Sequence, residues 1–481
     1  MFITQKYIHT ICKNVLLTGI LCLCGFVLRA EEAAPKWYNT HWENRVEVKV
    51  SNKQEIALQN EPVVMSGKYF KKKTGVVISG INTSSIIVTD NDGKLVPYQV
   101  DEKDNTGLYI KEPNQKLDVD DEIVFLVNVP EGDAKKFWIY FSKKGKPSIG
   151  DETSKVKIKN NTNGYGQVKV TTPHLEAIIK GPSSGDINNP SFNTHGIGNI
   201  TILKVEAVPM TDMSRNWGWT LPGEWMGGFP CSANVTMPAA IISGPVRSII
   251  IISRVLPGEL AKEERLTTKY MGYTGKVIRY FKFYGNAPLI EMEDIYDRGK
   301  WNMERVKKIR TRGGMGGIGI YSNLISVGIQ FPKPTTILYY PTETKGIFEK
   351  KFSNFKINKK VSVLYKKPNL QTDSWIAWVD TEDKKGLAIF YEAQGMGTVY
   401  YPYFVGNGKI EPVKIGGVYN YISYNKLLDD NLCRDNQQVR FKLAYRGLLK
   451  DDDGKQAQAY YRCWKTHISD MLKFGFIEEK E

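Results

Sequence analysis

The stretch from Ser243 to Arg298 constrains the fold of this chain more than any other, because it predicts three consecutive β-strands. Val246–Val255 is dense in isoleucine, which is typical of a strand buried on both faces of a sheet. After a polar connection, the runs Gly275–Tyr284 and Leu289–Tyr296 are joined by a short segment containing glycine, asparagine and proline. This pattern predicts a β-hairpin with a longer loop. The rest of the chain must pack around the sheet that these strands begin.

The alternation of side chains along a strand determines which residues of this hairpin share a face, if Tyr284 pairs with Leu289. One face is then mostly apolar and places Arg279 opposite Asp294. The other face is polar and holds two pairs, Lys282 opposite Glu291 and Tyr280 opposite Glu293. We interpret this polar face as solvated surface, and a ligand cleft is the alternative.

The composition favours a β-rich chain of two or three domains. The chain has 481 residues, including 26 tyrosines and 10 tryptophans, which are enriched in strands. Its formal net charge of +15 indicates an anionic partner, either nucleic acid, an anionic surface or an acidic polysaccharide. Scattered lysines that only solvate the surface are the alternative. The lack of clustered arginine argues against nucleic acid, so we expect no nucleic-acid partner.

The N-terminus predicts a secretory signal peptide at residues 1–30, cleaved near Ala30. Lys6 and Lys13 precede the apolar run Val15–Leu28, and a small residue follows it. The run is short for a membrane span, and a retained anchor is the alternative. No later stretch is long and apolar enough to cross a membrane. Cleavage removes three basic residues and no acidic ones, which leaves a net charge of +12. We therefore expect a secreted, periplasmic or cell-envelope protein.

Cysteine and histidine spacing gives no sign of a metal or haem site, so we expect no cofactor. The mature chain keeps Cys231, Cys433 and Cys463, too few for a disulfide scaffold, and a bridge between the last two is one option. CxxC, CxxCH and HExxH motifs are absent. Three aspartates between positions 118 and 121 could ligate calcium. Their spacing does not fit an EF-hand loop, and we interpret them as a loop before a strand.

Turn and strand signals divide the mature chain into a domain at 31–145, a linker at 146–163 and a second domain at 164–481. The linker is rich in Lys, Gly, Ser and Asn. The first domain is predicted to be an antiparallel β-sandwich, with strands near Arg45–Val50, Gly75–Ile78, Ser85–Thr89, Pro97–Val100, Glu122–Val127 and Lys136–Phe141. The second is a β-domain of roughly 300 residues, larger than an ordinary sandwich, with one helix near Lys455–Met471.

Several motifs resemble a family of secreted bacterial proteins. Val96–Asp101, VPYQVD, and Asp120–Leu126, DDEIVFL, are similar to the pattern of the small N-terminal sandwich in that family. Gly244–Arg247 with the hairpin that follows, and Trp375–Asp380 with Gly386–Phe390, resemble its second domain, a galactose-mutarotase-like β-supersandwich.

The resemblance implies an all-β fold, with an N-terminal antiparallel β-sandwich, a large galactose-mutarotase-like β-supersandwich and one C-terminal helix. The family includes exo-rhamnogalacturonan-lyase-like and other polysaccharide-lyase-like proteins, and proteins of unknown function. The helical toroid that accompanies the supersandwich in many lyases has no counterpart in this sequence. The catalytic residues of those lyases are therefore not carried over.

The loop Asn216–Phe229 is the most unusual segment of the sequence, since it places Trp217, Trp219 and Trp225 among glycines and a proline. Aromatic faces stack on the apolar C–H patches of sugar rings, and a loop can present them to a ligand. We interpret this loop as a sugar-binding element. The alternative is a loop folded back over the core with its indoles buried.

Candidates for proton transfer are His195, in a loop before a strand, and Tyr401, in a tyrosine-rich run around Pro402. Arg247 or Arg279 could neutralise a substrate carboxylate. A structural role is the alternative for each of these residues.

Glu291 and Glu293 share one face of the hairpin, and their spacing suits the two carboxyl groups of a glycoside hydrolase. Tyr280 and Lys282 lie opposite them and suit substrate binding or a structural polar network. Together, these features predict a secreted carbohydrate-active protein whose partner is an acidic polysaccharide or oligosaccharide. The enzymatic hypothesis is β-elimination. The alternatives are a non-catalytic glycan-binding or cell-envelope structural protein and a hydrolase that uses the two glutamates.

Changing Trp217 and Trp219 to alanine should weaken glycan binding without unfolding the protein, because exposed indoles contribute stacking area and little to the core. Glycan affinity and melting temperature, measured on the same preparation, test this. A large fall in melting temperature with unchanged affinity would show that the indoles belong to the core.

Overall fold

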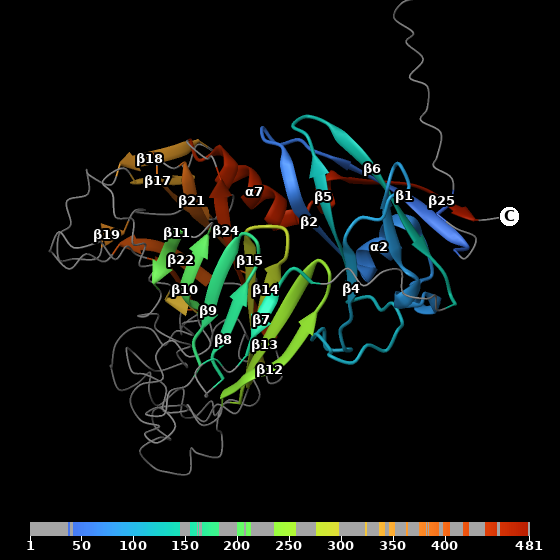
Figure 1. The fold of residues 1–481 in the computed structure, drawn as a ribbon, viewed down its shortest axis with the longest axis horizontal. Helices are drawn as coiled ribbons and strands as arrows, with labels where there is room; N and C mark the ends of the chain where they lie inside the picture. Colours follow the sequence, from blue (N-terminus) through green and yellow to red (C-terminus); the bar gives the residue numbers. More distant parts are fainter. Residues whose placement is uncertain are drawn as a thin grey trace, which may run out of the picture.

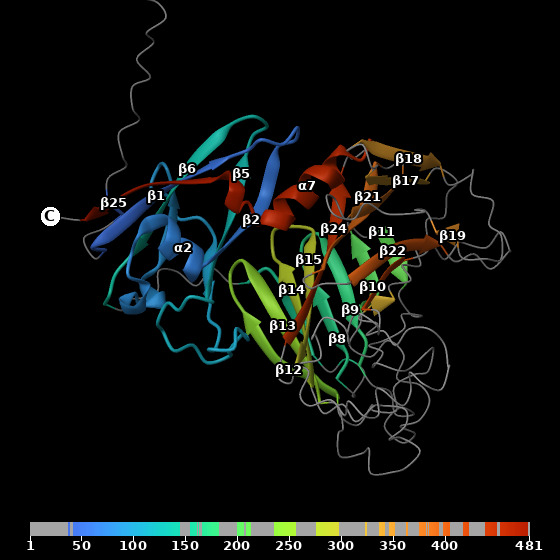
Figure 2. The same ribbon diagram turned by 180° about the vertical axis from the view of Figure 1, so that it is seen from behind.

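The computed structural model describes the residues 37–38, 42–144, 154–160, 162, 166–181, 200–205, 208–212, 235–255, 276–297, 323–324, 336–341, 346–351, 362–363, 375–380, 382, 384–393, 398–404, 417–422, 438–449 and 453–479. Within these ranges the chain forms antiparallel sheets with two α-helices (Figures 1 and 2). The predicted all-β class is confirmed.

The N-terminal domain is a sandwich of two antiparallel sheets. One has the strand order β25 (Leu472–Glu479), β1 (Asn44–Ser51), β6 (Ala134–Phe141), β3 (Ile87–Asp90), and the other β2 (Leu58–Ser66), β5 (Glu122–Val129), β4 (Tyr98–Asp101). Alternate residues of β1 (Val46, Val48 and Val50) are fully buried between the sheets, as a period-2 sequence requires, whereas β5 is buried without interruption from Ile123 to Val127. The rings of Phe125 and Phe137 meet across the interior with centroids 5.7 Å apart.

The strand β25 comes from the far end of the chain and completes the N-terminal sheet. It pairs with β1 from Asn44 opposite Glu479 to Val50 opposite Leu472, and Figure 1 shows red β25 beside blue β1. The ion pair between Arg45 Nη2 and Glu478 Oε2, at 2.6 Å, joins the two strands. The division at 164–481 stays a prediction, but residues 472–479 of that range add a strand to the N-terminal sheet.

A short helix that the sequence analysis did not predict, α2 (Gly67–Thr74), follows β2. The Ser66 hydroxyl accepts the Tyr69 N–H at its start, and Gly75 ends it in the left-handed region with φ 76°. The predicted strand at Gly75–Ile78 is therefore wrong, because Gly75 serves as a helix C-cap and Ile78 begins a 3₁₀ turn. The cap residues were visible in the sequence, but four lysines in the segment masked its helical pattern.

A nine-stranded antiparallel sheet forms the centre of the second domain. Its strand order is β12 (Val235–Ser243), β13 (Arg247–Val255), β14 (Lys276–Tyr284), β15 (Leu289–Asp297), β24 (Gln438–Leu449), β21 (Lys385–Ala393), β20 (Trp375–Asp380), β17 (Thr336–Pro341), β18 (Ile347–Lys351). The β14–β15 register is the predicted one, with Lys282 opposite Glu291 and Arg279 opposite Asp294. The predicted faces of the hairpin are therefore confirmed.

A five-stranded sheet covers one face of the nine-stranded sheet. Its order is β11 (Val208–Asp212), β10 (Ile200–Val205), β9 (Leu175–Ile179), β8 (Val168–Thr171), β7 (Lys157–Lys159). The sheets approach closely at Gly447, where a Cβ would lie 2.5 Å from Val205 Cγ1. A further sheet has the order β16 (Asn323–Leu324), β23 (Gly417–Ile422), β22 (Thr398–Phe404), β19 (Ser362–Val363).

The strand β7 lies inside the segment predicted as a linker. Lys157 and Lys159 are exposed, while Val156 and the half-buried Ile158 are more covered. Exposed lysines are common on edge strands, because they discourage pairing with another chain. The lysines that suggested a solvated linker therefore belong in part to an edge strand.

The opposite face of the nine-stranded sheet is covered by the N-terminal sandwich and by α7 (Lys455–Thr466). The rings of Tyr461 and Trp464 pack on Phe390 of β21, each with centroids 5.8 Å away. One cluster of buried apolar residues continues from the sandwich interior across this face to α7.

Cys463 on α7 is a buried free thiol, so the considered bridge to Cys433, which lies outside the described residues, is not formed. No helix in the described ranges has the length and apolar character to span a membrane.

Candidate functional site

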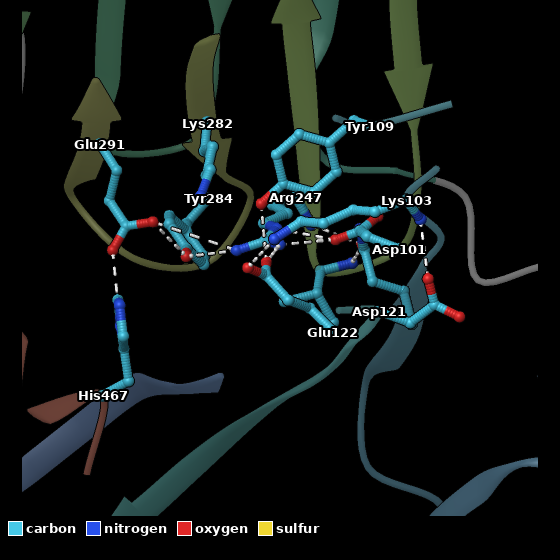
Figure 3. A network of polar contacts seen from close by, with 12 residues as sticks. Asp101, Lys103, Tyr109, Asp121, Glu122, Arg247, Lys282, Tyr284, Glu291 and His467 are labelled. Carbon is cyan, nitrogen blue, oxygen red and sulfur yellow. Dashed lines mark hydrogen bonds and ion pairs between the residues drawn. The ribbon is translucent and has the colours of Figure 1, made fainter. Parts of the chain in front are cut away.

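The polar face of the hairpin meets the N-terminal sandwich in a buried network, which we call the inter-domain joint (Figure 3). The joint begins at the turn between β12 and β13. Gln99 Oε1 of β4 accepts the backbone N–H groups of Val246 at 3.0 Å and Arg247 at 2.8 Å. A Cβ at Gly244 would lie 2.4 Å from the same oxygen, so a larger residue there would push the Gln99 amide away from its two backbone donors.

Arg247 is the centre of the joint and is fully buried. Its Nε donates to Asp101 Oδ2 at 2.9 Å, and its Nη2 forms ion pairs with Asp101 and Glu122. Its Nη1 donates to the Tyr284 hydroxyl at 2.9 Å. A guanidinium carries five N–H donors in a rigid fork, which matches this ring of oxygens. Strands of both domains therefore supply the partners of one cation.

The sandwich side of the joint contains a second cation and a tyrosine. Lys103 Nζ pairs with Glu122 Oε1 at 2.6 Å, and the Tyr109 hydroxyl donates to Glu122 Oε2 at 2.7 Å. The Tyr109 ring packs edge-on against Tyr280 of β14, with centroids 4.9 Å apart, and Lys282 Nζ lies 5.1 Å from the Tyr109 ring centre. The loop carrying Tyr109 thus inserts onto the polar face of the hairpin.

The sheet side of the joint runs from Tyr284 to the C-terminal end of α7. The Tyr284 hydroxyl donates to Glu291 Oε2 at 2.9 Å, and Arg247 Nη1 lies 4.0 Å from the same oxygen. Glu291 Oε1 lies 3.8 Å from Nδ1 of His467, the residue after α7. In Figure 3 the His467 and Glu291 side chains point toward each other, at the end of the network away from Asp121. His467 keeps 27% of its side chain exposed, whereas Glu291 keeps 7%.

Burial and neighbouring charges set the protonation states in the joint. Burial raises the pKa of Glu122, but Lys103, Lys282 and Arg247 outweigh it and hold the pKa well below its usual range. Burial raises the pKa values of Tyr109 and Tyr284 well above the ordinary value, so both hydroxyls keep their protons and donate. Glu122 is therefore ionised, and Tyr109 and Tyr284 are neutral, at physiological pH.

On the sheet side, the pKa values of Glu291 and His467 are both lowered, but by different causes. Burial raises the pKa of Glu291, but His467, Lys282 and Arg247 together hold it below its usual value. Burial lowers the pKa of His467 to about 4, and Lys442 and Lys282 lower it against the opposing effect of Glu291. At neutral pH, Glu291 is therefore charged and the His467 imidazole is neutral.

A second buried ion pair reinforces the contact between the domains. Arg446 Nη2 of β24 lies 3.0 Å from Glu61 Oε2 of β2, and the guanidinium stacks on the Tyr460 ring of α7, 3.8 Å from its centre. Burial raises the pKa of Glu61 and outweighs the lowering effect of Arg446. The charge of this pair, like that of Arg247, is matched across the two domains.

The structure brings together most of the polar residues that the sequence analysis singled out on β13 and on the hairpin. Arg247, Tyr280, Lys282, Glu291 and Glu293 share the face that meets the sandwich, and Lys282 Nζ pairs diagonally with Glu293 Oε2 at 3.5 Å. The interpretation of this face as solvated surface is wrong. Alternation shows which residues share a face, but the covering partner comes from a distant part of the chain.

Arg279 is separated from this set. It alternates onto the other face of β14, where it is fully buried and lies 5.9 Å from the centre of the Phe281 ring. Its backbone register opposite Asp294 is the predicted one.

The other predicted site residues lie where the structure gives no side-chain description. His195, Trp217, Trp219 and Trp225 fall outside the described residues, and Tyr401 is described only as a backbone position of β22, opposite Tyr419. Their assigned roles stay predictions.

One of the three aspartates considered as calcium ligands, Asp121, bonds the backbone of its own loop. Asp121 Oδ1 and Oδ2 accept backbone N–H groups of Lys103 and Asp118, each at 2.7 Å, so this side chain organises the loop before β5. Across the described residues, no group of three or more His, Cys, Asp and Glu is arranged to hold a metal ion.

Sequence reasoning missed the sandwich half of the joint and His467. Gln99, Asp101 and Glu122 stood in the motifs that carry the family resemblance, but nothing in a single sequence shows that those motifs contact Arg247. No local signal singled out His467, because it lies inside the helix predicted near Lys455–Met471, whereas α7 ends at Thr466. Its neighbour Glu291 lies 176 positions earlier and is brought close only by the tertiary fold.

Comparisons with known proteins leave the family open. No family model matches the chain, and no curated protein does. An α-mannosidase from Enterococcus faecalis V583 is 11% identical, with a TM-score of 0.38 over 91% of this chain and 46% of that one. A protein in glycosyl hydrolase family 38 from the same species is 11% identical, with a TM-score of 0.40 over 94% and 49%.

A protein from Synechocystis sp. PCC 6803 is 9% identical, with a TM-score of 0.32 over 63% of this chain and 99% of its own length. The chain spans about half the length of the two Enterococcus proteins. At these identities and TM-scores, the three likenesses carry no conclusion about the activity of this chain.

The substitution Arg247→Met should destabilise the folded protein by about 3–5 kcal/mol, because it leaves Asp101 and Glu122 buried without their shared cation. Denaturant unfolding measures this loss, with Lys135→Met, an exposed site on β6, as the matched control. Adding Asp101→Leu to Arg247→Met should recover part of the stability. A loss no larger than that of the control would show that the buried ion pairs do not hold the domains together.

His467 should make the protein less stable in mild acid. Its folded pKa of about 4 lies below the unfolded value of about 6.5, so the unfolded chain binds more protons between these values. Stability is therefore lost as pH falls through this window, by about 2 kcal/mol between pH 7 and pH 5. His467→Asn, which tolerates the left-handed backbone, should remove this loss. Parallel stability profiles of wild type and variant from pH 7 to 5 would contradict the assignment.

Proposed function

We propose that this chain is a secreted glycan-binding protein whose N-terminal sandwich is fixed on the large sheet by the inter-domain joint. The carbohydrate class is supported by the tryptophan-rich loop at 216–229 and by the motif resemblance. The positive charge of the chain favours an acidic polysaccharide as partner. The preference for binding over cleavage rests on the complete burial of Arg247 among partners supplied by the chain itself.

The burial of the joint argues against β-elimination and glycoside hydrolysis, the two cleavage mechanisms that would use its residues. A β-elimination needs a cation or strong donor near the substrate carboxylate, and Arg247 is already committed to Asp101 and Glu122. A hydrolase needs two carboxyl groups that reach the scissile bond, whereas Glu291 and Glu293 are both buried where the hairpin meets the sandwich. Arg247 and the four polar hairpin residues that share its face therefore support a structural role better than contact with a scissile bond.

A lyase acting on an acidic polysaccharide is the second candidate, and one observation favours it. His467 is neutral at physiological pH, partly exposed and close to an ionised carboxylate. A neutral imidazole held beside a carboxylate is a common arrangement for accepting a proton. His195 and Tyr401 remain the other candidates for this role.

A panel of neutral and acidic polysaccharides, incubated with the purified protein, tests both candidates. Binding and released products are recorded together, with ultraviolet absorbance reporting the unsaturated uronide that β-elimination leaves. Binding without product is the expected result, and it should weaken as salt rises if the partner is acidic. Product with uronide absorbance would establish the lyase in place of the binding protein. Product without it would indicate a hydrolase, and no binding to any glycan would refute the carbohydrate class.

A further inference from the structure

The outer face of the N-terminal sheet brings three lysines into one row. Lys473 of β25 pairs with Lys49 of β1, and Lys49 pairs with Lys136 of β6. The valines on either side of Lys49 in β1 are buried between the two sheets, so alternation places Lys49 on the outer face. Residues directly opposite each other in antiparallel strands share a face, so the three lysines form a row about 10 Å long across the strands.

The charge of this row is only partly matched within the described residues. Lys136 Nζ lies 3.3 Å from Glu47 Oε2, which gives one of the three lysines an acidic partner. Glu478, further along β25, already belongs to the ion pair that joins β25 to β1. Lys473 is exposed and Lys49 half-buried, and like charges directly opposite each other across strands are destabilising. An anion bound between the two lysines would remove this repulsion.

The same strand presents an aromatic ring to solvent. Phe476 is 92% exposed, more than any other large apolar side chain in the described part of the chain. It lies in β25, the edge strand of its sheet, where the register against β1 shifts. Lysines and bulges on an edge strand discourage pairing with another chain, whereas an exposed phenylalanine encourages it. Protection of the edge therefore accounts for Lys473 but gives no reason for Phe476.

Cations and an exposed ring on one strand match the chemistry of an acidic sugar polymer. An ammonium group pairs with a carboxylate, and an aromatic face stacks on the apolar C–H patches of a sugar ring. Lys473 and Phe476 are three positions apart, which is about 10 Å along a strand, so they can contact different sugar residues of one extended chain. Both side chains are exposed, so such a ligand reaches them on the open surface.

We propose that Lys49, Lys473 and Phe476 form a subsite for an acidic polysaccharide at the outer edge of the N-terminal sheet. The two lysines pair with carboxylates of the polymer, and the phenylalanine ring stacks on a sugar residue. This inference rests on the proposed glycan-binding function and adds to it a location and a set of contact residues. The last strand of the chain then contacts ligand as well as completing the sheet.

Affinities for polygalacturonate, alginate and carboxymethyl-dextran, measured on the full chain and its variants, test the subsite. For the polymer that binds most tightly, Lys473→Glu should weaken binding about tenfold, because it replaces an attraction with a repulsion. Phe476→Ala should weaken it about fivefold, and Phe476→Tyr should retain it, because only the first variant removes the ring. Lys157→Glu, at an exposed position on β7, makes the same change of charge elsewhere and should leave the affinity almost unchanged.

The melting temperatures of the same variants separate a ligand-binding role from a structural one. Lys473→Glu should melt at the wild-type temperature or above it, since the new carboxylate lies opposite Lys49 and relieves the like-charge contact. Weaker binding without a loss of stability is the signature expected of a residue that contacts ligand. A clear fall in melting temperature, with polysaccharide affinity unchanged, would show that Lys473 holds the strand in place.

Three other outcomes overturn the inference in different ways. If an acidic polysaccharide binds, but Lys473→Glu and Phe476→Ala bind it as tightly as Lys157→Glu does, the subsite is wrong while the glycan-binding function stands. The same holds if only neutral polysaccharides bind. If a DNA duplex binds as tightly as the polysaccharide, and Phe476→Ala changes neither affinity, the row is a general anion-binding surface. If no polysaccharide binds, both the subsite and the proposed function fail.

Discussion

The complete burial of one arginine determines how the two halves of this chain fit together. Arg247 begins the strand β13, yet two of its three acidic neighbours come from β4 and β5 of the N-terminal sandwich. A buried guanidinium is strongly disfavoured unless its charge is matched and its N–H groups are bonded. Neither domain alone supplies all the partners, so the charge of Arg247 is compensated only when the sandwich sits on the sheet.

Apolar contacts also hold the two halves of the chain together. A single core cluster extends from the sandwich through the nine-stranded sheet to α7, and β25 then carries the chain back into the N-terminal sheet. The chain therefore crosses between the two halves more than once. This arrangement also gives a physical meaning to the motifs behind the family resemblance, because Gln99, Asp101, Glu122 and Gly244 all contribute to the contact around Arg247.

Local patterns predicted the strands well and their partners poorly. The hairpin register followed from alternation alone, because a shift by one residue would have reversed both faces. The environment of the polar face could not be predicted in this way, since the pattern of Lys282 and Glu291 fits a solvated surface or a ligand cleft and does not show that another domain covers it. The helix α2 was missed because its lysines hid its pattern. The pairing of β25 with β1 and the approach of His467 to Glu291 depend on long-range packing, for which a single sequence holds no periodic signal.

Calorimetric unfolding of the wild-type protein tests most directly whether Arg247 and its partners join the two domains into one cooperative unit. The shared core and the matched buried charges predict a single transition, whose calorimetric and van't Hoff enthalpies agree. They also predict that the transition separates into two when Arg247 is replaced. Two well-resolved transitions in the wild-type protein, with the positions of both unaffected by the replacement, would contradict this account.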